Sequence, residues 1–145
     1  MALVLAGGIK NLPCAAIALH EGYLYYINSG VMTLYTTVAQ VIAGIAVESS
    51  IDDLGDAKTL SSGQMMPFFT PGCGKIVKVA SKTGVTWTLS QKVYGGQTAT
   101  TDGLADDTGT NGAILLGHYM GPNGVATTAD GDLIDVALDV PIGGI

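Results

Sequence analysis

Short apolar runs separated by turn-forming residues are the feature that most limits what this chain can fold into. The runs are about five to eight residues long, are rich in Val, Ile, Tyr and Thr, and end at Gly, Asn, Asp or Pro. This pattern is typical of strands, because an amphipathic helix repeats its apolar residues every three or four positions. The sequence therefore predicts an all-β fold class: a small β-barrel or sandwich with short hairpins and at most one short helix. The expected strands are Pro13–Leu19, Tyr23–Ile27, Val31–Tyr35, Val41–Val47, Gln64–Phe69, Lys75–Ala80, Val85–Leu89, Ala113–Met120 and Leu133–Asp139.

The expected strand Tyr23–Ile27 is apolar or aromatic on both of its faces. Successive side chains of a strand point to opposite sides, so Tyr25 lies on one face and Leu24 on the other. A strand with two apolar faces is expected between two layers of protein. The sequence therefore predicts that this strand is buried on both sides.

The chain is interpreted as a single β domain covering residues 1–145, since this length fits one domain. Residues 1–11 and 140–145 are expected to be extended terminal segments that contact other subunits. Residues 95–112 are rich in Gly, Thr and Asp, and a run of this length without strand pattern predicts a long projecting loop.

Local signals predict turns and one helix. Asn28-Ser29-Gly30 is typical of the tight turn of a hairpin, and Asn123-Gly124 and Asp130-Gly131 indicate two more turns. Segment Ser49–Leu60 begins with a Ser-x-x-Asp spacing that is typical of a helix cap. We expect a helix of a turn or two there, which Gly55 keeps short.

The composition indicates a protein that works in contact with other proteins. Hydrophobic residues make up 48% of the chain and charged residues 12%, and the mean hydropathy is +0.42. Apolar surface that one small domain cannot bury usually lies against another protein. We therefore expect an oligomer or a permanently bound subunit.

The charges argue against a nucleic-acid partner. The chain has a net charge of -6, six lysines and no arginine, whereas phosphate binding needs basic side chains gathered on one face. The only local group is Lys75, Lys78 and Lys82, and in a strand these side chains do not share one face. No contact with nucleic acid is expected.

A membrane partner is not expected either. Segment Gly22–Val47 has no charge and is long enough to cross a bilayer. Its interior holds Asn28, Ser29, Thr36 and other polar side chains, which lack partners in lipid. Strands joined by turns explain the segment better.

The cysteines carry no metal pattern. Cys14 and Cys73 are the only two, with no CxxC and no paired histidines. Two buried thiols are the simpler interpretation, and one disulfide stays open. Gly72-Cys73-Gly74-Lys75 is the nearest fragment to a phosphate-binding loop, but Phe69 replaces its first glycine and Ile76 its magnesium-binding hydroxyl.

No catalytic constellation is expected. No serine stands in a GxSxG motif. His20 and His118 are the only candidates for a general base near neutral pH, and neither has a partner at a suitable spacing. The chain is therefore predicted to be no enzyme, with no catalytic and no cofactor-binding residues.

One group of aspartates is a candidate calcium site. Asp130, Asp132 and Asp135 lie within one short segment, as ligands of a hard cation often do. The spacing departs from an EF-hand, since Gly131 lies between the first two aspartates and no glutamate stands at the place of the bidentate ligand. A solvated hairpin turn is the preferred interpretation, so no metal site is predicted.

A series of segments between Ala43 and Asp139 resembles the head-decoration, or capsid cement, proteins of tailed phages. The likeness consists of turn glycines and strand alternation in a fixed order and covers about two thirds of the chain. The segments that carry it are Gly44–Val47, Gly63–Phe69 (GQMMPFF), Gly74–Val79 (GKIVKV), Trp87–Tyr94 (WTLSQKVY), Leu115–Tyr119 (LLGHY) and Gly131–Leu138 (GDLIDVAL).

This resemblance implies a β-barrel or sandwich subunit, commonly a homotrimer, on the outer capsid surface of a virion. Its partners would be the major capsid protein and further copies of itself. By clamping neighbouring capsid subunits it would oppose the outward pressure of packed DNA without making or breaking a bond. Three weak contacts made at once raise avidity by roughly 10² to 10⁴.

Two other functions remain open from the sequence. A self-assembling filament or tail-tube subunit would have the same low charge and β content. A small trimeric hydrolase of nucleotides suits the length, but such sites usually hold phosphate with arginine, which this chain lacks.

Overall fold

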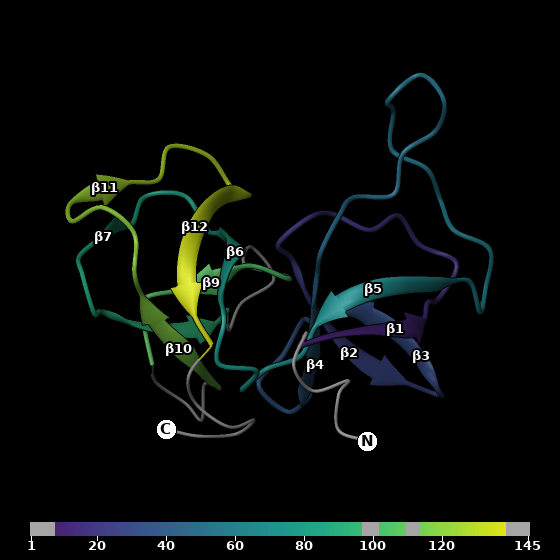
Figure 1. Cartoon of the computed structure of the whole chain (residues 1–145), viewed down its shortest axis with the longest axis horizontal. Coiled ribbons are helices and arrows are strands. Elements are labelled where there is room, and N and C mark those ends of the chain that lie inside the picture. Colours follow the sequence, from purple (N-terminus) through teal and green to yellow (C-terminus); the bar gives the residue numbers. More distant parts are fainter. Residues whose placement is uncertain (1–7, 97–101, 110–113, 139–145) are drawn as a thin grey trace.

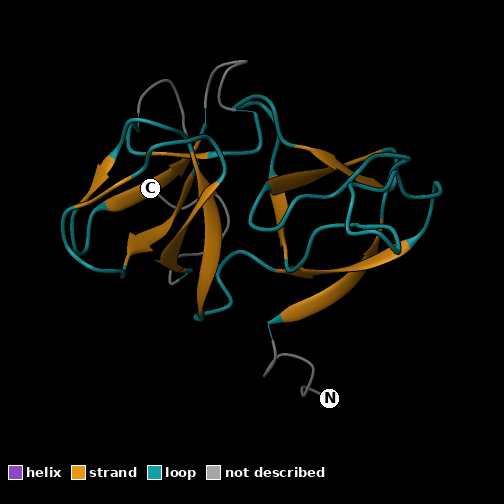
Figure 2. Cartoon of the chain, turned by 90° about the horizontal axis from the view of Figure 1, so that it is seen from above, coloured by secondary structure: helices purple, strands orange, loops and turns teal. Residues whose placement is uncertain are grey.

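The structure, a computed structural model, describes residues 8–96, 102–109 and 114–138. Within these ranges there is no helix, and the strands form two β units side by side along the longest axis (Figure 1; from above in Figure 2). The predicted all-β fold class is thereby confirmed. Segment 22–47 folds into strands joined by turns, as expected from its polar interruptions.

The N-terminal unit is one five-stranded antiparallel sheet with the order β1-β5-β4-β2-β3. After β1, Cys14 forms a parallel bridge to Met32, and the Ala15 N–H donates to the Met32 carbonyl at 3.0 Å. The two edges of the sheet therefore meet, and the sheet curls on itself. Its strands are β1 (Ile9–Pro13), β2 (Leu24–Asn28), β3 (Val31–Leu34), β4 (Ile42–Ala46) and β5 (Met65–Phe69).

The C-terminal unit is a closed barrel with the order β10-β12-β6-β9-β8, beside which β7 and β11 form a two-stranded ribbon. All pairs in the barrel are antiparallel except β6 with β9. The strands are β6 (Ile76–Ser81), β7 (Thr86–Trp87), β8 (Lys92–Gly95), β9 (Ala105–Asp106), β10 (Leu115–Tyr119), β11 (Val125–Ala126) and β12 (Asp132–Ala137).

Strand β2 is buried on both faces, as predicted. Leu24 belongs to a hydrophobic cluster that combines N-terminal residues with the barrel interior, including Val79 and Trp87. Tyr25, the next residue, belongs to a second cluster with Phe68 inside the curled sheet. The N-terminal sheet is therefore covered by its own residues on one side and by the barrel on the other.

Backbone hydrogen bonds also join the two units. The Leu24 N–H donates to the Gly103 carbonyl at 2.8 Å, and the Gly103 N–H donates to the Tyr35 carbonyl at 2.7 Å. The Ala80 N–H donates to the Gly22 carbonyl at 2.8 Å. A side chain at Gly103 would contact Leu34 closely, and its φ of +71° also favours glycine.

The hairpin turn between β2 and β3 is confirmed. Ser29 and Gly30 both have positive φ, 52° and 84°, as a two-residue primed turn requires. Strand Pro13–Leu19, in contrast, was predicted wrongly: β1 ends at Pro13 and the following residues bend. Their apolar side chains pack into the second hydrophobic cluster, of which Cys14 and Leu19 are buried members. Burial in this cluster, and not pairing in a sheet, explains why the residues after Pro13 are apolar.

Other boundaries differ from the sequence-based expectation. Strand β7 keeps only two residues of the predicted Val85–Leu89, and β8 was not predicted. Ile9–Asn11, part of the predicted terminal segment, pairs with β5, and β9 lies within the predicted 95–112 loop. Of the predicted terminal and loop segments, residues 1–7, 97–101, 110–112 and 140–145 lie outside the described residues.

Candidate binding surfaces

A hairpin formed by residues 49–60 projects from the N-terminal unit, where a short helix was predicted (Figure 1). Ile51 and Ala57 form an antiparallel bridge across it, and the Asp52 N–H donates to the Asp56 carbonyl at 2.8 Å. The helix prediction is wrong because Ser49 and Ser50 do not cap a helix. Their hydroxyl groups accept backbone N–H donors from residues 19 and 21 instead.

The hairpin tip, defined here as Ile51–Ala57, is held by one aspartate. Asp52 Oδ1 accepts the N–H groups of Leu54 and Asp56 at 2.9 and 3.0 Å. The Gly55 N–H donates to the Asp52 carbonyl, and φ of Gly55 is +85°. Asp at the first position of a turn and Gly at the fourth are typical of a type I turn. Asp52 and Gly55 are therefore the sequence signal of this turn, and the Ser-x-x-Asp spacing is not a helix signal here.

The base of the hairpin is tied to the chain before β2. The buried Ser50 Oγ donates to the Lys58 carbonyl at 2.6 Å and accepts the Leu19 N–H at 2.8 Å. The Leu60 N–H donates to the Ile17 carbonyl at 2.9 Å. These contacts fix the direction in which the hairpin projects.

The braced tip presents apolar side chains to solvent. Leu54 is 86% exposed and Ile51 is 57% exposed. Asp52, Asp53 and Asp56 are exposed beside them. The tip is therefore an apolar knob surrounded by negative charge.

A groove lies beside the start of β1 and has a volume of about 540 Å³. We call this the β1 groove, and it is lined by Gly8–Lys10 and Thr70–Cys73. The Thr70 N–H donates to the Gly8 carbonyl at 3.0 Å, which holds its two walls together. The walls are mainly apolar, and Lys10 and the nearby Lys75 are exposed.

A second groove, of about 400 Å³, lies on the N-terminal unit beside β2 and β4. Ile27 and Val41 line it and are 53% and 60% exposed. Gln40 closes the adjoining turn, since its Oε1 accepts the Thr36 N–H at 2.7 Å. None of the residues that line this groove carries a charge.

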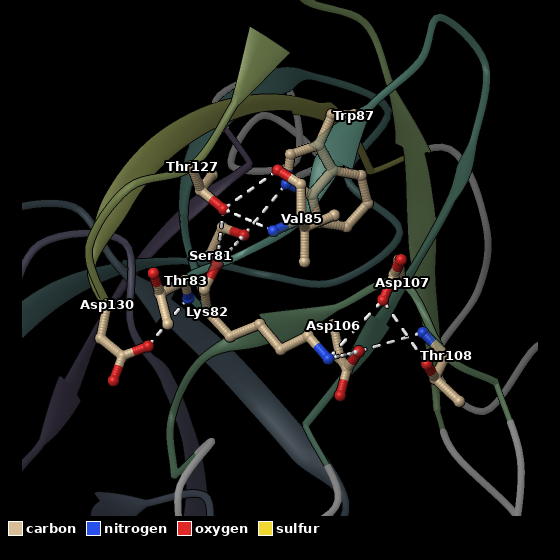
Figure 3. Close-up of polar contacts among 10 residues, drawn as sticks. All are labelled: Ser81, Lys82, Thr83, Val85, Trp87, Asp106, Asp107, Thr108, Thr127 and Asp130. Carbon is tan, nitrogen blue, oxygen red and sulfur yellow. Dashed lines mark hydrogen bonds and ion pairs between the residues drawn. The ribbon is translucent and has the colours of Figure 1, made fainter. Parts of the chain in front are cut away.

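The barrel contains a polar network that joins β6 to β9 (Figure 3). Lys82 Nζ lies 2.9 Å from Asp106 Oδ1 and 3.7 Å from Asp107 Oδ1. Burial of Asp106 opposes its ionisation, but hydrogen bonds from Lys82 and from the Thr108 N–H lower its pKa overall. The hydrogen bond to Asp106 raises the pKa of Lys82. The pair bridges the one parallel contact of the barrel, so we assign it a structural role.

Further polar contacts close the barrel around its tryptophan. Trp87 Nε1 donates to Ser81 Oγ at 3.0 Å, and the Trp87 ring stacks on Tyr119 with centroids 5.9 Å apart. Thr127 Oγ1 donates to the Lys82 carbonyl at 2.8 Å and accepts the Val85 N–H at 3.1 Å (Figure 3). These buried groups therefore satisfy one another's hydrogen bonds inside the barrel.

The two histidines lie on different units. His20 is exposed before β2, and its ring lies 5.1 Å from the Tyr23 ring. His118 is half-buried in β10, opposite Lys92 and Ala137. The structure therefore does not bring the two candidate bases together.

The three aspartates that were weighed as a calcium site each have other partners. Asp130 Oδ1 accepts the Thr83 N–H at 2.8 Å, and Asp135 Oδ1 lies 2.6 Å from Lys78 Nζ. Asp132 Oδ2 accepts two backbone N–H groups of the preceding turn, which lowers the pKa of Asp132. Among the described residues, no group of three or more His, Cys, Asp or Glu side chains is placed to hold a metal ion.

The cysteines are both free thiols. Cys14 is buried, and this burial raises the pKa of its thiol. Cys73 is half-buried in the β1 groove. The Gly74 N–H of the phosphate-loop-like fragment donates to the Leu138 carbonyl at 2.8 Å, so this amide is already used within the fold.

Comparison with known proteins gives no relative for this chain. No protein-family model, no curated protein and no solved structure matches it. A search for helices that could span a bilayer found none in the part of the chain that the structure describes.

Proposed function

We propose that this chain is a viral structural protein, a decoration (cement) subunit that binds the outer surface of a tailed-phage capsid and clamps neighbouring capsid subunits. It acts as a homotrimer, without catalysis and without contact with nucleic acid. The proposal is supported by the resemblance of six strand and turn segments between Ala43 and Asp139 to such proteins. The acidic net charge of -6 suits a protein kept away from the packaged genome.

One structural observation carries the proposal: each of the two β units has uncovered apolar side chains on its surface. Ile27 and Val41 line the groove beside β2 and β4 on the N-terminal unit. Leu89 and Val125, 55% and 39% exposed, lie on the barrel unit, Leu89 two residues after β7 and Val125 in β11. A clamp needs two separate contact surfaces, and each of these is small enough to give only a weak contact alone.

Weak contacts at two surfaces are sufficient when they act together. Complete burial of one Ile, Val or Leu side chain contributes about 1.5 to 3 kcal/mol, and these side chains are already partly covered. Each surface therefore gives a modest affinity, which a trimer multiplies by roughly 10² to 10⁴ in avidity when the spacing of sites matches.

The test is binding to empty capsids of the tailed phage whose genome encodes the chain, prepared without this protein. We expect the wild-type chain to co-sediment with them and to raise the temperature at which they open. Val41→Ser and Leu89→Ser should each weaken binding on the order of tenfold, because each removes one apolar contact. Ser62→Ala, at an exposed turn position before β5 and away from both surfaces, serves as the control and should bind like wild type.

Two outcomes contradict the proposal. Absence of co-sedimentation at micromolar protein would refute capsid binding. Mass that keeps growing with concentration, without a closed species, would favour the filament or tail-tube subunit, because a contact that does not close produces open polymers.

A further inference from the structure

The hairpin tip and the β1 groove of this chain are complementary in chemistry. The tip presents Leu54 and Ile51 among carboxylates. The β1 groove offers about 540 Å³ between mainly apolar walls, with exposed Lys10 and Lys75 beside it. A volume of this size accommodates several side chains. Knob and groove thus match both in polarity and in the sign of their charge.

We propose that the hairpin tip of one copy docks into the β1 groove of a second copy of this chain. Two molecules with a net charge of -6 each repel one another overall, so a stable contact between copies needs a local pairing of opposite charges. The β1 groove has two lysines at its border, and the tip has aspartates on both sides of Leu54.

The occupant of the groove is a neighbour's tip and not the chain's own. Hydrogen bonds of Ser50 with Leu19 and Lys58 fix the base of the hairpin. Figure 1 shows the hairpin projecting away from β1 and β5. The Asp52 turn also keeps the tip in one shape before contact, which lowers the entropy lost on binding.

Because tip and groove are different surfaces, the contact is heterologous. Each copy inserts its tip into one neighbour and receives the tip of another. Such a contact closes into a ring when the rotation between copies permits it, and a trimer is the smallest ring in which no copy meets the same neighbour twice. The inference rests on the homotrimer part of the proposed function and does not involve the capsid.

Cross-linking tests this contact directly, because a native thiol already lines the groove. In Leu54→Cys, oxidation with diamide should join the introduced thiol at position 54 of one copy to Cys73 of another. Cys14 is completely buried and should stay unreacted. We expect a ladder on a non-reducing gel, and peptide mapping should find the link between positions 54 and 73.

Two controls keep the result specific. Leu54→Cys combined with Cys73→Ser should abolish the ladder, and Leu89→Cys, also at an exposed position on the barrel, should not link to Cys73. A link between two thiols at position 54, a link within one chain, or no link at all overturns the proposal. A groove occupied by residues 1–7 or 139–145 would give the last of these results.

Charge reversal gives an independent test that needs no new thiol. Asp53→Lys and Lys10→Glu should each weaken self-association on the order of tenfold, measured by sedimentation equilibrium without capsids. The double variant should recover most of that loss, because the ion pair is restored with reversed sign. Purely additive effects overturn the proposal, whereas capsid binding by wild type would stand in either case. All these side chains are exposed, so the fold should persist, as circular dichroism can verify.

Discussion

Substitution of Ser50 by alanine should destabilise the chain far more than the same substitution at Ser49. Both hydroxyl groups accept a backbone N–H at 2.8 Å, but from different environments. The Leu19 N–H that Ser50 accepts is buried, whereas the Glu21 N–H that Ser49 accepts is open to water. The two variants therefore form a matched pair that differs in burial.

The magnitude follows from what each variant leaves behind. In Ser50→Ala the Leu19 N–H stays buried without its acceptor, which costs about 1 to 3 kcal/mol. The Lys58 carbonyl also loses the hydroxyl donor, but Lys58 is exposed and water can replace that donor. We expect a total loss of about 2 to 3 kcal/mol in the free energy of unfolding. For Ser49→Ala we expect at most about 0.5 kcal/mol.

Urea unfolding followed by tryptophan fluorescence measures the difference. With a slope of about 2 kcal/mol per molar urea, the midpoint of Ser50→Ala should fall by about 1 to 1.5 M relative to wild type. Hydrogen exchange of the Leu19 amide should also accelerate in this variant alone. Equal midpoints for Ser49→Ala and Ser50→Ala would refute the reasoning that burial of the N–H decides the cost.

Three further predictions concern the barrel. Gly117→Ala should prevent folding, because a Cβ there overlaps the Ala137 carbonyl oxygen of the neighbouring strand. Expression trials and circular dichroism would show this loss of fold. A folded variant with wild-type stability would contradict the prediction. Hydrogen bonds hold the pKa of Asp106 below its usual 3.8 despite burial. The Asp106 carboxylate therefore stabilises the fold fully at a pH above 3.8. This contribution is lost as the pH falls through the lower pKa of the folded state. Asp106→Asn should therefore be less stable at neutral pH and lose less stability in acid, as urea midpoints at several pH values would show; an acid loss equal to that of wild type would contradict it. Trp87→Phe should lower the free energy of unfolding by about 2 to 4 kcal/mol, since it removes buried volume and the hydrogen bond to Ser81 Oγ. Urea unfolding followed by circular dichroism measures this loss. A loss under 1 kcal/mol would mean that the hydrogen bond and the packing of Trp87 contribute little.

The strands that could be predicted from the sequence are those whose apolar residues lie on buried faces and end at turn residues. Strand β2 and its turn follow from two apolar faces and a Ser-Gly pair that tolerates positive φ. Strands β4, β5, β6 and β10 match the predicted ranges with boundary shifts of at most two residues, because each is a mainly apolar run between turn residues.

The parts that escaped prediction depend on contacts distant in sequence. Strand β9 has only two residues, and it exists because Ala105 pairs with Ser81 and with Gly95. The apolar residues after Pro13 pack into a hydrophobic cluster without forming a continuous strand. The alternation of apolar and polar residues in the sequence does not distinguish this case from a strand. Segment 49–60 was predicted as a helix from its local Ser-x-x-Asp spacing. The actual partner of the Ser50 hydroxyl is the Leu19 N–H, 31 residues earlier, which local spacing does not reveal.

Folding and binding use separate parts of this molecule, and this separation makes the proposals testable. The largest buried side chains, such as Trp87 and Tyr25, lie in two clusters that meet at β2. The hairpin tip lies outside both clusters, and its own hydrogen bonds set its shape. Leu54→Ser should therefore leave the free energy of unfolding within about 0.5 kcal/mol of wild type while it weakens association between copies. A parallel loss of stability and association would mean that Leu54 supports the fold, and the tip would then be no independent binding element.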